Sequence, residues 1–187
     1  MEPEREAEAS TQVTIRDAEP GDRASIVEIL TGSFRDFPPL AMIVGTDAGA
    51  DDRRRRMMKA TLAAPPEKLR IIVAERDGWV LGVLTYADSP GCMAVNGLQA
   101  RTYLRVYGPR LPAMLRGVVA ILRMHPRTPH RHLPMVGVDP ACQGQGIGQL
   151  LLTEYVHRCD EAGLPGYLET VRFTHPGRPS HEQRSSA

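Results

Sequence analysis

One glycine-rich stretch limits the possible folds of this chain more than any other part of its sequence. An apolar run that ends at Val138 is followed by a loop with alternating glycines and then by leucines at helical spacing. This order predicts a strand, a loop and a helix. The alternation lets successive backbone N–H groups face one side, beside the positive end of the helix, as in sites for phosphate or pyrophosphate. The alternative is a tight turn with glycines for steric reasons only. The three glycines are Gly144, Gly146 and Gly148.

Length, charge and cysteine content narrow the class of protein. The chain has 187 residues, enough for one domain with a substantial core and short for two. A formal net charge of +1 gives no electrostatic reason to expect nucleic acid or an acidic membrane as a partner. No apolar run reaches the length of a membrane span, and the N-terminus lacks the apolar core of a signal peptide. The three cysteines form no CxxC pair, which suits a reducing compartment. We therefore expect a soluble cytoplasmic protein, monomeric or homodimeric.

Hydrophobic periodicity and turn residues divide the chain into predicted elements. Residues 1–12 are polar and acidic and are expected to be a disordered tail. Segment 38–49 is expected to be a loop because prolines and glycines interrupt it, and 91–107 shows no clear pattern. The predicted elements are a strand at 13–16, helices at about 20–34 and 51–63, hairpin strands at 69–75 and 79–86, a helix at about 110–124, a strand at 131–138, a helix at 146–160 and a strand at 166–170.

This order of elements predicts the fold class. It combines an antiparallel hairpin with one strand–helix–strand unit, which gives an α/β fold with a central sheet of mixed direction. Ligands bind such sheets beyond the carboxyl end of a strand, where the glycine loop falls. The basic run 53–56 lies in a predicted helix, so its side chains point around the whole cylinder. We interpret it as solvated helix surface paired with Asp51 and Asp52, rather than as a binding patch.

Two nucleotide-binding motifs compete for the glycine loop, and neither fits. A Rossmann fingerprint requires GxGxxG directly after its strand, but here the spacing is GxGxG and five residues intervene. Glu169 does lie at a distance where it would hold a ribose hydroxyl, which is the one feature in favour of that motif. A Walker A loop requires Lys followed by Ser or Thr after the glycines, and this chain has neither there.

The loop resembles the acetyl-CoA signature of the GNAT superfamily of N-acetyltransferases, which is Gln/Arg-x-x-Gly-x-Gly/Ala. Residues 143–148, Gln-Gly-Gln-Gly-Ile-Gly, match it, and 136–140 and 167–170 are also similar to this family. The resemblance covers 13–170 in element order and 132–170 in specific sequence. It implies a GNAT domain over 13–170, with a mixed central sheet flanked by helices.

The resemblance also implies how the site is divided. Backbone N–H groups of the loop would bind the CoA pyrophosphate, and the strand edge before it would pair with the pantetheine arm as an added strand would. The N–H near Val138 would polarise the thioester carbonyl. Acetyl would pass directly from acetyl-CoA to a primary amine of a small molecule or a protein, with no metal. The implied cofactor-binding residues are Val136, Gly137, Val138, Gln143, Gly144, Gln145, Gly146, Ile147 and Gly148.

Acetylation of an amine requires a proton acceptor, for which several residues are candidates. His132 lies on the strand that leads into the loop, and Glu169, Tyr86 and His130 are alternatives. A lone histidine near a strand start is more often structural. We expect a structural role for Cys142, since the sequence shows no base beside it and the family generally transfers acetyl directly.

The C-terminal residues depart from the family's pattern. GNAT chains typically continue with an Asn-rich turn, a helix that carries a tyrosine, and two final strands. Here 171–187 is rich in Pro, Arg, Ser and His and predicts an unstructured tail. The hypothesis is a C-terminally truncated or frameshifted domain whose strand at 166–170 is an exposed sheet edge. The alternative function is accordingly a degenerate domain that binds CoA without catalytic turnover.

Overall fold

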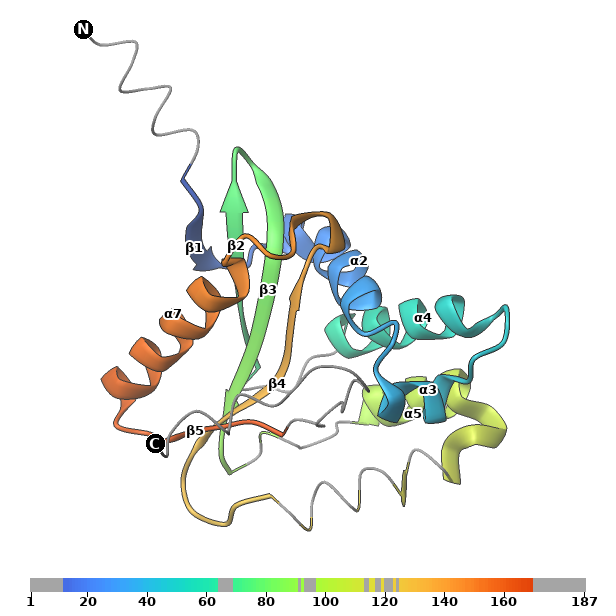
Figure 1. Ribbon diagram of the computed structural model, residues 1–187. Coiled ribbons are helices and arrows are strands. Elements are labelled where there is room, and N and C mark those ends of the chain that lie inside the picture. Colours follow the sequence, from blue (N-terminus) through green and yellow to red (C-terminus); the bar gives the residue numbers. More distant parts are fainter. Residues whose placement is uncertain are drawn as a thin grey trace, which may run out of the picture.

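The fold is a five-stranded sheet with helices on both faces (Figure 1). The computed structural model describes residues 12–63, 69–90, 92, 97–112, 115–116, 119, 123 and 125–169. The strands are β1 Thr14–Asp17, β2 Arg70–Arg76, β3 Trp79–Asp88, β4 Arg131–Val138 and β5 Gly166–Tyr167. The helices are α2 Arg23–Ser33, α3 Pro38–Val44, α4 Ala50–Ala63, α5 Gly97–Tyr107 and α7 Ile147–Ala162, with 3-10 turns at Pro20–Asp22, Gly108–Arg110 and Pro140–Cys142.

The strands follow one another across the sheet in chain order. Neighbours from β1 to β4 are antiparallel, whereas β4 and β5 are parallel, so the predicted mixed sheet is confirmed. The β2–β3 connection is the predicted Asp-Gly turn, with φ of 54° at Asp77 and 79° at Gly78. Positive φ at both central residues matches the twist of the two strands.

The sheet opens between its last two strands. β5 pairs with β4 only at Arg131 and His132, at the lower end of β4 in Figure 1. Within the described residues, no strand pairs with that side of β4 from 133 to 138. The Asp139 N–H donates to the Leu81 carbonyl in β3, at 2.8 Å. Because backbone groups alternate along a strand, the N–H groups of Val138 and Val136 face the open side. Pro134 has no N–H and so leaves no donor unpaired there.

Each face of the sheet has its own apolar core. On one face, α2, α3, α4 and α5 pack together over β2 and β3, and on the other face α7 is the one helix of the described residues that packs (Figure 1). Ile147, Leu151, Tyr155 and Cys159 recur at helical spacing and form the buried side of α7. They meet a sheet surface that includes Ile72, Leu84 and Tyr86. No helix in the described part of the chain is both long and apolar enough to cross a membrane.

Two sequence-based expectations were wrong, and both errors have a local cause. The 38–49 segment contains α3, because Pro38 and Pro39 occupy its first turn, where a missing N–H breaks no helical bond. The basic run was expected to be solvated, but Arg54 is buried and donates to the Arg35 carbonyl at 3.1 Å. The expected pairing with aspartate is present, since Arg54 also forms an ion pair with Asp51.

The remaining expectations agree in outline. The strand at 131–138 is present with the expected ends. The helices expected at 20–34, 51–63 and 146–160 and the strands at 13–16, 69–75 and 79–86 are present with shifted ends. The last strand covers 166–167 of the expected 166–170, of which residue 170 lies outside the described residues. Segment 91–107, which showed no clear pattern, contains α5. Of the helix expected at 110–124, residue 110 ends the 3-10 turn Gly108–Arg110, and residues 111, 112, 115, 116, 119 and 123 are helical. The rest lies outside the described residues. The expected tails 1–12 and 171–187 also lie outside them, apart from residue 12.

We expect Gly82→Ala to lower the free energy of unfolding by about 1–3 kcal/mol, because the core beneath α7 has no room for another carbon. A Cβ at Gly82 would lie 2.9 Å from Ile147 Cγ2 and 3.0 Å from Leu151 Cδ1. The matched control is Gly97→Ala in the first turn of α5, where an added Cβ meets nothing within 4 Å. The control is expected to be neutral or stabilising. Denaturant unfolding of both variants tests this, and equal stabilities would contradict the close packing of α7.

Candidate functional site

The glycine loop joins the end of β4 to the start of α7. Asp139 begins it by accepting a hydrogen bond from the Ala141 N–H, at 2.9 Å, which fixes the 3-10 turn Pro140–Cys142. Gly144 and Gly146 then both adopt a φ of 79°. This left-handed conformation favours glycine, so these two positions meet a backbone requirement. The loop therefore has the sharp reversal that brings backbone N–H groups in front of α7.

The loop faces open space. A Cβ at Gly144 or Gly146 would meet no atom within 4 Å. The first backbone bond of the helix runs from the Leu150 N–H to the Gly146 carbonyl, at 3.1 Å. The preceding N–H groups of α7 have no carbonyl one turn earlier and carry the positive end of the helix dipole. These donors and the free space before them suit an anion such as a phosphate group.

Side chains around the loop reinforce its shape and charge. The Gln143 Nε2 donates to the Val138 carbonyl at 3.4 Å, and the Ser33 Oγ donates to the same carbonyl at 3.0 Å. Arg76, at the end of β2, donates to Gln145 Oε1 at 3.5 Å. This guanidinium adds a positive charge beside the loop. Sequence analysis missed Arg76 because 69 residues separate it from Gln145 and no local spacing connects them.

The open edge of β4 leads directly from this loop. Val136 and Val138 turn their N–H groups to that edge, as described above, while their side chains pack partly buried against the core beneath α7. Gly137 is buried against α2, where a Cβ would come within 2.8 Å of Ser33 Oγ. The strand edge can thus pair with an extended, amide-bearing ligand whose anionic end lies at the loop.

A second group of polar side chains lies at the other end of β4. The His132 Nε2 is 2.7 Å from Glu169 Oε2, and the His125 Nδ1 is 3.3 Å from Glu169 Oε1. Burial lowers the pKa of His132, although the hydrogen bond to Glu169 opposes this effect. Burial alone would raise the pKa of Glu169, but the hydrogen bonds from the two imidazoles outweigh it and the pKa is lowered. At neutral pH the pair is therefore a carboxylate beside a neutral His132 imidazole.

Comparison with known protein families identifies the family of this chain. The family model described as acetyltransferase (GNAT) family matches residues 25–184 of this chain. The chain belongs to the GNAT acetyltransferase family. The matched range contains β4, the glycine loop and α7.

Solved structures share the fold. A histone acetyltransferase HPA2 and related acetyltransferase from Corynebacterium glutamicum is 20% identical, with a TM-score of 0.68 over 87% of this chain and 78% of that one. The enzyme AAC(6')-Iy, in complex with a bisubstrate analogue, is 14% identical with a TM-score of 0.50 over 88% and 83%. A GNAT family acetyltransferase from Brucella melitensis in complex with acetyl-CoA is 24% identical with a TM-score of 0.49 over 87% and 79%. At these identities the first two show the fold alone.

The structure brings some of the sequence-predicted candidates together and separates others. His132, Glu169 and His130 lie in one cluster at the start of β4, joined by His125. Tyr86 lies on the α7 side, where its hydroxyl accepts from the Arg158 guanidinium at 3.0 Å and its ring lies 4.9 Å from the Arg131 guanidinium carbon. His125 was missed by sequence analysis. Its signal was the recurrence of histidine at positions 125, 130 and 132.

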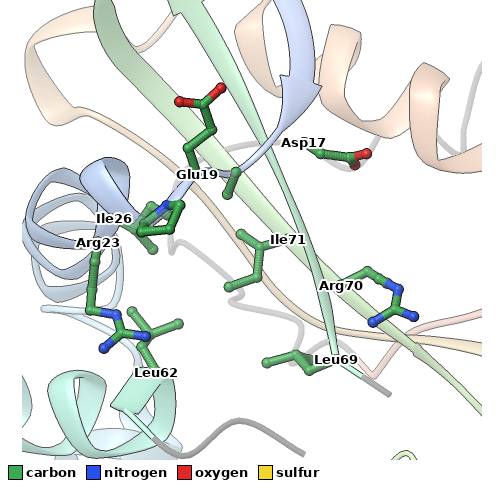
Figure 2. Close-up of a pocket in the computed structure, with 10 residues that line it drawn as sticks. Asp17, Glu19, Arg23, Ile26, Leu62, Leu69, Arg70 and Ile71 are labelled. Atoms are coloured by element: carbon green, nitrogen blue, oxygen red, sulfur yellow. The ribbon is translucent and has the colours of Figure 1, made fainter. Parts of the chain in front are cut away.

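One further pocket lies apart from β4 and α7. Its volume is about 390 Å³, and it lies where β1, α2, α4 and β2 meet (Figure 2). Figure 2 shows its apolar lining, with Arg23 and Arg70 at opposite sides; the apolar residues labelled there are Ile26, Leu62, Leu69 and Ile71. None of its lining residues comes from the glycine loop, so it is not part of the candidate acetyl-CoA site.

Proposed function

We propose that this protein transfers an acetyl group from acetyl-CoA directly to the primary amine of a small molecule or a protein. The observation that carries the proposal is the glycine loop at the start of α7 beside the unpaired edge of β4. The loop supplies N–H donors for the pyrophosphate, and the edge supplies Val136 and Val138 for the pantetheine amides. The fold neighbour AAC(6')-Iy in complex with a CoA-S-monomethyl-acetylneamine analogue supports an amine as the acceptor class.

We also propose that β4 determines the position of the thioester. A pantetheine arm that pairs with β4 runs from the loop toward the point where β5 meets Arg131 and His132. The amine nitrogen attacks the thioester carbonyl carbon, the carbon–sulfur bond breaks, and CoA leaves as a thiolate. An N–H on the exposed edge would stabilise the oxyanion of the tetrahedral intermediate. The ammonium formed by the attack must lose a proton, which ends on the leaving thiolate or on a base near this point.

We infer that Glu169 is the proton acceptor and that His132 positions it. The side chain of Glu169 is 23% exposed, so an acceptor amine can reach its carboxylate, whereas that of His132 is only 2% exposed. The hydrogen bond from His132 Nε2 at 2.7 Å fixes the carboxylate at the end of β4. We also infer that the reaction occurs in the reducing cytoplasm, since none of the three cysteines is in a disulfide.

We expect Gly146→Asp to weaken acetyl-CoA binding by at least about tenfold, or 1.4 kcal/mol, because a carboxylate would enter the anion site. The matched control is Gly163→Asp at the other end of α7. Gly163 also has a positive φ, 63°, and a Cβ there also meets nothing within 4 Å. Backbone strain is therefore similar in the two variants, and only the first places a charge at the loop. Calorimetric titration with acetyl-CoA measures both, and equal affinities would refute the loop assignment.

We expect Glu169→Gln to lower kcat by about 10²–10⁴-fold with a nearly unchanged KM for acetyl-CoA, because the amide does not accept the proton. Glu161→Gln is the control, since Glu161 is exposed on α7 and lies 3.8 Å from its only ion-pair partner in the described chain, His157. CoA release is measured with a panel of primary amines. An unchanged kcat in Glu169→Gln would show that Glu169 is not the proton acceptor. It would not affect the assignment of the acetyl-CoA site. Tight acetyl-CoA binding with no turnover of any amine would instead support a degenerate domain.

A further inference from the structure

Metal-ligand atoms gather at one point beside the start of β4. One ligand atom from each of Cys92, His125 and His132 lies within 4.8 Å of the other two. Cys92 and His132 are buried, and the His125 side chain is only 11% exposed. The Cys92 Sγ is 3.1 Å from His125 Nε2. Cys92 lies 33 positions before His125 in the sequence, so the fold brings the thiol to the two histidines.

The hydrogen bonds of the histidines determine which nitrogen of each carries a lone pair. His130 Nδ1 is 2.7 Å from the Thr128 carbonyl, which only accepts, so Nδ1 carries the proton and Nε2 the lone pair. His125 Nδ1 faces a Glu169 carboxylate oxygen, so its Nε2 likewise carries a lone pair. These two Nε2 atoms are 2.9 Å apart. Two lone pairs at this distance repel each other unless a proton or a metal cation is shared near them.

His132 supplies a third lone pair. Its Nε2 donates to Glu169, which leaves the lone pair on Nδ1. That Nδ1 is buried and, in the structure, has no hydrogen-bond partner. An unsatisfied buried polar atom destabilises the folded chain, and this one is too deeply buried for a substrate amine to reach it. A cation bound to this nitrogen would satisfy it.

The carboxylate of Glu169 completes a pattern typical of metal sites. Histidines that bind a metal through one ring nitrogen usually donate the other N–H to a carboxylate, which fixes the ring orientation. Glu169 accepts from His132 with one oxygen and from His125 with the other. The nitrogens left for a metal are then His132 Nδ1 and His125 Nε2, both of which carry lone pairs.

We propose that Cys92, His125 and His132 bind a zinc ion, with His130 Nε2 as a fourth candidate ligand. A thiol proton donated to His125 would satisfy one nitrogen of the cluster, whereas Zn²⁺ would engage the thiolate and several lone pairs together. Thiolate with imidazole is a ligand set that Zn²⁺ prefers and Mg²⁺ or Ca²⁺ does not. In a tetrahedral zinc site the sulfur and nitrogen ligands lie about 3.5 Å apart. The 3.1 Å between Cys92 Sγ and His125 Nε2 is within a few tenths of an ångström of this spacing.

The zinc site is independent of the acetyl-CoA loop, and its test uses no acetyl-CoA. The full chain, purified without a polyhistidine tag and treated with a chelator, is titrated with Zn²⁺ alone and then with Co²⁺. We expect about one ion per chain, and for Co²⁺ a thiolate charge-transfer band in the near ultraviolet with visible bands of tetrahedral intensity. Zn²⁺ should also raise the melting temperature, because it binds the folded chain and not the unfolded one.

Variants identify the ligands. We expect Cys92→Ser to abolish the charge-transfer band, and His125→Ala and His132→Ala each to weaken Zn²⁺ binding more than tenfold. Glu169→Gln should weaken it about 10–100-fold, as expected for a carboxylate behind the ligands. The controls Cys142→Ser and His157→Ala should bind as the unaltered chain does, because neither residue belongs to the cluster.

Two outcomes would overturn the proposal. One is an unaltered chain whose Co²⁺ form lacks the thiolate band, a result that requires no variant to fold. The other is Zn²⁺ binding that persists equally in Cys92→Ser, His125→Ala and the two controls, which would indicate adventitious surface binding. An unaltered chain that transfers acetyl but binds no zinc would overturn only this proposal, whereas one that binds zinc but transfers no acetyl would overturn only the proposed function.

Discussion

The hydroxyl of Tyr155 links β4 to β5, and both ends of the candidate site depend on this junction between the two strands. It donates to the Arg131 carbonyl of β4 at 2.6 Å and accepts from the Tyr167 N–H of β5 at 3.2 Å. Tyr155 is itself buried on α7, and burial raises its pKa far above the usual range, so the phenol stays protonated and keeps donating. The two strands therefore meet at a fixed point and nowhere else in the described chain. The histidine cluster lies at this junction, and the open edge of β4 begins beyond it.

The same helix fixes the glycine loop. α7 can lie close to the sheet because Gly82 has no side chain beneath Ile147 and Leu151. This packing sets the direction of the α7 axis and hence of its N-terminal N–H groups. The loop glycines have no packing role of this kind, since a Cβ at Gly144 or Gly146 meets nothing. These glycines require positive φ and face open space. Both features argue against the alternative that the loop is only a tight turn whose glycines avoid steric clashes.

The sequence was most informative where a function is encoded by neighbouring residues. The strand, the loop and α7 form one continuous stretch, so periodicity and glycine spacing predicted their order, and the family resemblance predicted their role. The proline pair at 38–39 misled because the same residues suit a loop and a first helical turn. Cys92 and His125 could not be connected from the sequence, since 33 residues separate them and their contact depends on how the chain returns to β4. His132 and Glu169 were identified as separate candidates, and only the fold shows that they are hydrogen-bonded.

β4 has opposite electrostatic requirements at its two ends. Beyond Val138, N–H donors and the helix dipole favour an anion, whereas around His132 three imidazole lone pairs and a thiol favour a cation. Six strand residues at about 3.3 Å each separate these points by about 20 Å. At about 20 Å two unit charges interact by less than about 1 kcal/mol even at an effective dielectric constant of about 20. An anion at the loop and a cation at the histidines should therefore bind with nearly additive free energies. The acetyl group, carried along β4 by the pantetheine arm, would react toward the histidine end of the strand, where Glu169 would accept the proton.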